Sequence, residues 1–393
     1  MPPDDPFFQL IPHATGRLRS LHIEGPSEDM QVVTSRLSHP APLLEHLSIS
    51  YDPRRLGPLV QLPILASTLF NGDLSSLRTL SLKSIYTELP WRNMVNLTSF
   101  TLHFTRGALS VRQLLDFFES APHLKELELH SATPTVDVQN WRVVSLACLK
   151  SMRVDDHDNP SSVLLDHLLI PVGAKLELRT EWRGSLIGGH LPRSLDNLEN
   201  LSDFTTIKLH LQPKNCYLDM NFGGPNGQVK MTFSSYRNNP TDLMVGSLSE
   251  FDTSKTEQLE IYHGRLLTGD LLYQALLPMN DLRTLILSGC TNQDVFIRAL
   301  QPTTSWSDFV VCPKLEEIVL TLLFEGMFDT TSVVEMAAAR ASKGKRLRTI
   351  RIIGGQGGAG LNVSELRKHV WNVEHGPGTG LWVPVSLICC SVS

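Results

Sequence analysis

The sequence predicts an α/β fold of repeated strand and helix units, an irregular solenoid with a parallel β-sheet on its concave face and helices outside. Three observations lead to this prediction. The pattern L-x-x-L-x-L recurs along the chain, three copies (APLLEHLSI, APHLKELEL, CPKLEEIVL) share a proline entry, and segments of helical period lie between copies. Because the last two apolar residues are two positions apart, they point to the same face of a short strand.

The strand pattern can be followed along most of the chain. Clear copies begin at Leu18, Leu44, Leu77, Leu97, Leu124, Leu149, Leu282, Leu315 and Leu347, and the weaker copies GAKLEL, FTTIKL, NGQVKMTF and TEQLEI lie between Leu149 and Leu282. The mean period of about 27 residues lies in the leucine-rich-repeat range. Cys290, in LRTLILSGC, is expected where that motif carries an Asn or Cys that bonds to backbone after the strand.

Helices are expected between the strands. SVRQLLDFF opens with a capping box of Ser110 and Gln113, and SVVEMAAARAS repeats the box with Ser332 and Glu335. Asn362 is expected to cap a helix over NVSELRKHV. Each proline entry then ends a helix and starts the next strand, because proline cannot continue a helix.

The middle of the chain is less regular. CYLDMNF and QVKMTFS alternate apolar and polar residues across GGPNG, which predicts a β-hairpin. We interpret residues 173–255 as an irregular middle of one solenoid over 18–374, with a lead-in at 1–17 and a C-terminal tail at 375–393. The alternative is a division into two domains.

Composition limits the partners and the compartment. The 393 residues carry a net charge of −5, and no Lys/Arg run indicates nucleic acid or an anionic membrane as a partner. The six cysteines form no C-x-x-C pair. Neither a signal peptide nor a membrane-spanning segment is recognisable in the sequence. We therefore expect a cytoplasmic or nuclear protein without stable membrane insertion.

Motifs that carry chemistry are few. GQGGAG, Gly355 to Gly360, follows an expected strand and precedes an expected helix. This context leaves a nucleotide- or metal-binding enzyme that uses the turn as one alternative function, and a free-standing or truncated repeat scaffold as another. A glycine turn is the preferred interpretation, since no acidic residue follows at 375–380 and Leu361 replaces the Walker lysine. VDDHDNP, from Asp155 to Pro160, could hold a hard cation, although a solvated turn is the simpler interpretation. We therefore predict no catalytic residue, cofactor or metal site, and a non-enzymatic protein. The C-terminal CSVS makes Cys390 a lipidation candidate.

The solenoid prediction places a binding surface on the concave face. In each strand the residue between the last two apolar positions, and the residue after them, should point to solvent or to a protein or peptide partner. The partner-binding candidates chosen in this way are Lys83, His103, Glu128, His130, Arg153, Asp155, Lys208, His210, Glu260 and Tyr262.

The repeat array, CPKLEEIVL, SVVEMAAARASKGKRLRTIRI and VSELRKHVWNVE together resemble the leucine-rich half of fungal F-box-like proteins, from about Leu18 to Glu374. The resemblance implies that the repeats recognise substrates for a cullin-type ubiquitin ligase, whose adaptor becomes a partner if an F-box is supplied. The F-box itself is not found in this chain. Only about 17 residues precede the first repeat, and the other Leu-Pro pairs lie inside the array.

Overall fold

The computed structural model describes residues 14–25, 33, 35–51, 64–65, 69–87, 94–103, 109–132, 142–156, 162–181, 198, 203–212, 217–234, 248, 251–262, 269–290, 293–301, 310–321, 330–354 and 362–376. The chain divides into two compact units. Unit 1 comprises Met1–Phe204 and Asn221–Asn238, and unit 2 comprises Thr205–Met220 and Asn239–Ser393.

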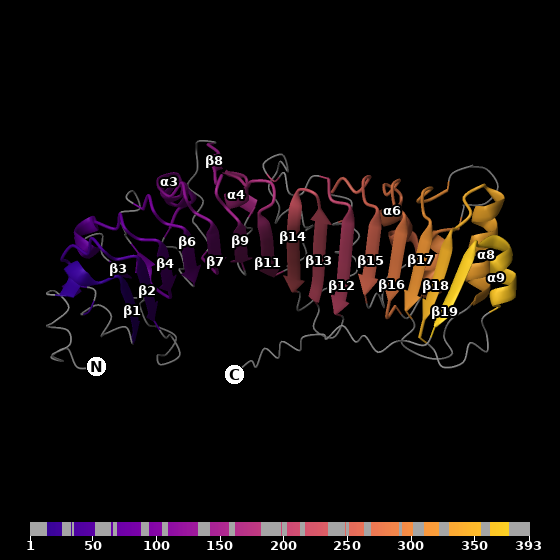
Figure 1. Ribbon diagram of the computed structural model, residues 1–393, viewed down its shortest axis with the longest axis horizontal. Coiled ribbons are helices and arrows are strands. Elements are labelled where there is room, and N and C mark those ends of the chain that lie inside the picture. The colour runs from indigo at the N-terminus through magenta and orange to yellow at the C-terminus, as the bar shows by residue number, and fades with distance from the viewer. Residues whose placement is uncertain are drawn as a thin grey trace. The chain divides into compact units, whose positions relative to one another are not determined.

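Unit 1 is built on a parallel sheet (Figure 1). Its strands lie in the order β1 (Ser20–Gly25), β2 (His46–Tyr51), β4 (Thr79–Lys83), β6 (Ser99–His103), β7 (Glu126–His130), β9 (Ser151–Asp156), β11 (Lys175–Glu181) and β14 (Gly227–Ser234). Every neighbouring pair in this series is parallel. Two short parallel pairs accompany it, β3 (Ile64–Leu65) with β5 (Tyr86–Thr87) and β8 (Val144–Ser145) with β10 (Leu168–Leu169). Its described helical segments are η1 (Thr15–Arg17), η3 (Leu69–Gly72), α3 (Val111–Ser120) and α4 (Ser162–Leu165).

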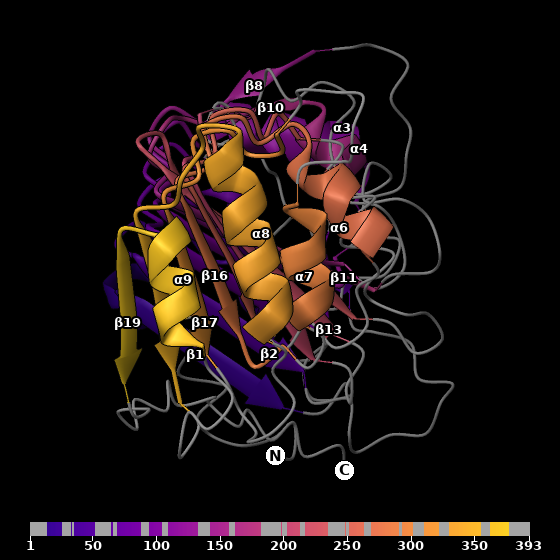
Figure 2. The same cartoon turned by 90° about the vertical axis from the view of Figure 1, so that its right-hand side faces the viewer.

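Unit 2 has a parallel sheet with helices on one face. The strands lie in the order β12 (Thr206–Gln212), β15 (Gln258–Tyr262), β16 (Thr284–Ser288), β17 (Glu317–Thr321), β18 (Thr349–Ile353) and β19 (Asn372–Gly376), all parallel. The helices are α6 (Gly269–Leu276), α7 (Gln293–Ala299), α8 (Thr330–Ser342) and α9 (Val363–His369). Each helix contacts the next one in the series, and Figure 2 shows them side by side along one face of the strands.

All thirteen strands expected from the sequence are present, and the strands of the clear copies begin two residues after the first leucine of each copy. The expected hairpin arms are also strands, because β13 (Tyr217–Gly224) and β14 are separated only by Pro225 and Asn226. The order in the sheet differs from the order in the sequence, since β11 has β14 as its parallel neighbour although β12 and β13 precede β14 in the chain. The chain passes between the units at three points, and one of them, between Met220 and Asn221, falls inside β13.

A recurring turn explains the proline entry. The backbone N–H of Leu124 donates to the carbonyl of Ala121 at 3.1 Å, with Pro122 at the second turn position. Proline favours that position because its φ is fixed near the required value. The next two backbone N–H groups both donate to the carbonyl of Thr98 in the preceding repeat, at 2.8 and 3.0 Å. The same turn hydrogen bond precedes the copies at Leu18, Leu44, Leu77, Leu97, Leu149, Leu282 and Leu315, so these strands start at equivalent positions.

The apolar residues of the pattern form the core. In β7 the side chains of Leu127 and Leu129 are buried, whereas Glu128 and His130 between and after them are partly exposed. Burial of each leucine side chain contributes about 1.5–3 kcal/mol relative to exposure. Helix α3 packs on this apolar face, with the ring of Phe117 4.6 Å from that of Phe100 in β6. The opposite face of the sheet carries the polar positions.

The helix caps are partly as expected. Ser110 and Gln113 form the reciprocal capping box at the start of α3, and the Asn362 side chain accepts a hydrogen bond from the backbone N–H of Glu365 in α9. The second capping box was predicted wrongly, because α8 begins at Thr330 and Ser332 is a buried residue inside it. The pattern S-x-x-E marks a helix start only where no earlier turn extends the helix. Among the described helices, none has the length and apolar content needed to cross a membrane.

A buried arginine ties α8 to the turn before β17. The Arg340 side chain is fully buried and donates hydrogen bonds of 2.8 Å to the backbone carbonyls of Val311 and Cys312. Burial lowers the pKa of Arg340 to about 10, so the guanidinium remains a cation at neutral pH. The two carbonyls are thereby satisfied in a region that water does not reach.

Candidate partner-binding face

The polar positions of unit 1 form two rows on the face opposite the core, which we call the open face. Matched registers place His22, Ser48, Ser81, Thr101, Glu128, Arg153, Glu177 and Lys230 in one row, and Glu24, Ser50, Lys83, His103, His130, Asp155, Arg179 and Thr232 in the other. Adjacent strands in a sheet lie about 4.8 Å apart, so neighbours within a row are in contact range.

Unit 2 has the same two rows. One contains Lys208, Glu260, Ile286, Val319, Arg351 and Glu374, and the other contains His210, Tyr262, Ser288, Thr321, Ile353 and Gly376. Of the ten candidate binding residues, six lie in the rows of unit 1 (Lys83, His103, Glu128, His130, Arg153, Asp155) and four in those of unit 2 (Lys208, His210, Glu260, Tyr262). Their role in binding remains a prediction.

The open face of unit 1 carries a groove across four neighbouring strands. A groove of about 220 Å³ crosses β6, β7, β9 and β11, lined by Ser99, Phe100, Thr101, Glu126, Leu127, Glu128, Ser151, Met152, Arg153, Lys175 and Glu177. Acidic and basic side chains alternate along it, and Glu126 and Lys175 are exposed. Glu128 and Arg153 are among the residues predicted from the sequence, whereas Glu126 and Lys175 are not. The strand pattern could have identified them. Glu126 and Lys175 each occupy the first position of a strand, two residues before Glu128 and Glu177, and therefore share their face of the sheet.

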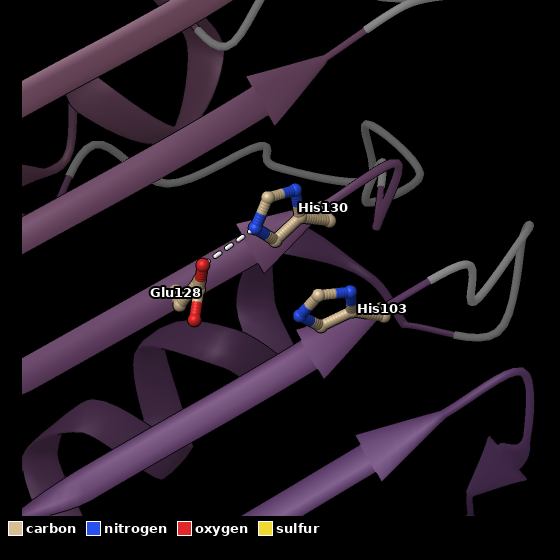
Figure 3. A group of neighbouring side chains, drawn as sticks. All are labelled: His103, Glu128 and His130. Atoms are coloured by element: carbon tan, nitrogen blue, oxygen red, sulfur yellow. Dashed lines mark hydrogen bonds and ion pairs between the residues drawn. The ribbon is translucent and has the colours of Figure 1, made fainter. Parts of the chain in front are cut away.

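Next to this groove, two histidines and two carboxylates gather in unit 1. The rings of His103 and His130 stack with centroids 4.1 Å apart. The His130 ring bonds at both nitrogens, with Nε2 2.6 Å from Glu128 Oε1 and Nδ1 3.3 Å from Asp155 Oδ2. Figure 3 shows His103, Glu128 and His130, with a ring nitrogen of each histidine on the side of the carboxylate. Arg153 completes the cluster, its guanidinium 3.6 Å from Glu128 Oε1.

The pKa values of the two imidazoles are shifted in opposite directions. Burial, with the neighbouring His130, lowers the pKa of His103 to about 4, so this ring is neutral at physiological pH. The hydrogen bond with Asp155 raises the pKa of His130, and the bond with Glu128 adds to this effect while burial opposes it. Two rings on adjacent strands therefore present one neutral base and one carboxylate-paired base.

A second cluster lies on the open face of unit 2. Glu260 is only 4% exposed. Its Oε1 accepts from Lys208 Nζ at 2.9 Å and from Gln258 Nε2 at 2.6 Å, and its Oε2 accepts from the Tyr262 hydroxyl at 2.6 Å. Burial alone would raise the pKa of Glu260, but these hydrogen bonds outweigh it and hold the pKa below its usual value. His210 stacks on Tyr262 with centroids 4.1 Å apart.

Cys290 behaves as the repeat pattern predicts. Its buried Sγ lies 3.7 Å from the backbone carbonyls of Ile261 and of Ser288, at the end of β16. A thiol is a weak donor, so the contact orders the turn after the strand without contributing much energy.

Three motifs fall outside the described residues. They are the glycine turn from Gly355 to Gly360, the loop residues 157–160 of VDDHDNP, and Cys390 at the C-terminus. The nucleotide-binding and lipidation hypotheses therefore stay predictions. Asp155, the first aspartate of VDDHDNP, lies in β9 and contacts His130.

The strand order and registers define an α/β protein with large, mostly parallel sheets built from a repeated strand unit. No protein-family model matches the chain. No curated protein matches it either. Among solved structures, an internalin from Listeria monocytogenes is similar over 93% of this chain and 83% of its own, with 11% identity and a TM-score of 0.23. A TM-score this low does not establish a common fold, so the fold class is based on the strands of this chain.

Proposed function

We propose that this protein is a leucine-rich-repeat solenoid whose open face binds a protein or peptide partner without a catalytic step. The observation that carries the proposal is the groove across β6, β7, β9 and β11, which lies between side chains of both charges. Strands fix the Cα positions along the groove, so binding would require little ordering of the backbone.

The chemistry of the open face suits an extended peptide of mixed charge. Glu126 and Lys175 lie exposed at the strand starts, where a partner reaches them without displacing internal contacts. Glu128 and Arg153 are paired with each other and partly exposed, so they hold their positions before a partner arrives. Arginine and tyrosine are frequent binding hot spots, which makes Arg153, and Tyr262 in unit 2, the anchor candidates.

The resemblance to F-box-like proteins gives this proposal its specific form. The partner would be a protein destined for ubiquitination in the cytoplasm or nucleus, and the ligase adaptor would join through an F-box supplied with the repeats. The groove carries the binding proposal by itself, whereas the ligase role depends on the resemblance alone.

Affinity purification with a matched pair of double charge reversals tests the binding proposal. The groove variant is Glu126→Lys with Lys175→Glu, and the control is Glu335→Lys with Lys345→Glu, both exposed in or just after α8 in unit 2. Each pair conserves net charge and alters only exposed side chains, so unchanged melting temperatures are expected. We expect partners recovered with the wild type and the control to be lost with the groove variant.

Equal recovery by both variants would contradict the groove as the binding site. The same purification separates the two parts of the proposal. Recovery of the adaptor and cullin with the wild type supports the ligase role. Groove-dependent partners without adaptor or cullin would leave a binding scaffold and refute the ligase role.

A further inference from the structure

We propose that His103, His130 and Glu128 bind one divalent cation of the zinc class on the open face of unit 1. The ligand atoms of these three residues lie within 4.8 Å of one another, each partly exposed (Figure 3). Two imidazole nitrogens and one carboxylate oxygen form a donor set typical of zinc sites that keep a fourth position for water.

The backbone holds the three ligands in place. His103 ends β6 and His130 ends β7, and the two residues are direct partners in the parallel register. Glu128 precedes His130 by two residues on the same strand and therefore shares its face. No loop has to fold for the site to form. Among the described residues, this is also the group of histidine, cysteine and carboxylate side chains whose geometry could hold a metal ion.

A second carboxylate orients His130 as an outer-shell partner would. Asp155 Oδ2 lies 3.3 Å from Nδ1 of His130, on the adjacent strand β9. Metal-binding histidines usually bond through their other ring nitrogen to a carboxylate or carbonyl, which fixes the tautomer and makes the ligating nitrogen more basic. Here that arrangement leaves Nε2 of His130 directed toward Glu128.

Metal binding would replace the hydrogen bond between His130 and Glu128. Nε2 of His130 and Oε1 of Glu128 are hydrogen-bonded at 2.6 Å. With bonds of about 2.0–2.2 Å to zinc, tetrahedral ligand atoms are about 3.3 Å apart. The contact between Glu128 and His130 therefore has to lengthen by about 0.7 Å, and the stacked rings have to rotate so that ligand atoms up to 4.8 Å apart converge on the ion. The proton of the hydrogen bond is released to solvent.

Nearby positive charge opposes the cation. The Arg153 guanidinium is 3.6 Å from Glu128 Oε1, and Lys83 is the register partner of His103. Removal of one of these charges should therefore strengthen metal binding. This expectation distinguishes a metal site from a cluster in which Arg153 and Glu128 only stabilise the fold.

Zinc titration of the full chain tests the proposal. The chelator-treated, dialysed protein is titrated with Zn²⁺ against a chromophoric indicator, and Co²⁺ is used to read coordination by visible absorption. We expect one site per chain, lost in His103→Ala and in the near-isosteric Glu128→Gln. Asp155→Asn should weaken binding about 10–100-fold, and Arg153→Gln should tighten it severalfold.

His22→Ala is the matched control, because His22 lies beside a carboxylate, Glu24 at 3.7 Å, on the same face but has no third ligand among the described residues. This variant should bind zinc as the wild type does. Circular dichroism confirms that each variant is folded. The proposal is overturned if the wild type takes up no more Zn²⁺ than the folded Glu128→Gln variant, or if Arg153→Gln and Asp155→Asn leave the affinity unchanged.

Discussion

Glu260 in unit 2 gives a quantitative test of the open-face electrostatics. Glu260→Gln preserves the shape of the side chain but removes the charge that accepts from Lys208, Gln258 and Tyr262. A hydrogen bond to a charged group contributes about 1.5–3 kcal/mol. The Lys208 pair is discounted to below about 1 kcal/mol because that lysine is 45% exposed. The glutamine oxygen still accepts from one donor, so we expect a loss of about 2 kcal/mol at neutral pH.

The pH dependence identifies the charge as the cause. The folded-state pKa of Glu260 is lowered from 4.5, so its contribution is fully present above pH 4.5 and is lost as pH falls through the folded pKa. Urea unfolding of wild type and Glu260→Gln should therefore differ at neutral pH and converge in acid below pH 4.5. An equal difference at both pH values, or none at neutral pH, would refute this reasoning.

Two further changes test the packing of the repeats. Arg340→Met leaves the buried carbonyls of Val311 and Cys312 without a donor, which costs about 1–3 kcal/mol each. Removal of the buried cation offsets part of this cost. Urea unfolding should therefore show that the free energy of unfolding falls by about 2 kcal/mol. Arg298→Met, at an exposed position of α7, is its control and should change stability by less than about 0.5 kcal/mol; equal effects would contradict the role of Arg340. Ser110→Ala should cost about 1 kcal/mol by loss of the α3 capping box, and an unchanged unfolding midpoint would contradict that estimate.

The strands were predictable because the pattern is local. Three apolar positions within six residues specify which side chains enter the core, and the turn before each strand fixes where the strand begins. Glu128 and His130 could therefore be assigned to one face of the sheet from sequence alone. The same alternation placed Lys208 and Glu260 correctly in a row.

The neighbours of each strand were less predictable. β11 pairs with β14, which lies some 50 residues further along the chain, and the local pattern contains no information on so distant a partner. The cluster of His103 with His130 was missed for a related reason. The two histidines belong to different repeats, and only the register of β6 with β7 brings their rings together.

Arg340 shows a further limit of pattern reasoning. Its place in SVVEMAAARAS suggests a solvated cation in the last turn of a helix, yet the side chain is fully buried. The acceptors are backbone carbonyls of a turn that precedes it by nearly thirty residues. A sequence pattern contains no information on such acceptors, since every residue has a carbonyl.

Site-specific photo-crosslinking in the native cells is the most direct test of partner binding on the open face. A photoreactive residue is placed at Glu126 or Lys175 in the groove, and at Glu335 or Lys345 in or just after α8 as controls, all four being exposed. The account predicts that the same partner protein becomes covalently attached from both groove positions and from neither control. Attachment from the control positions, with none from the groove, would contradict it.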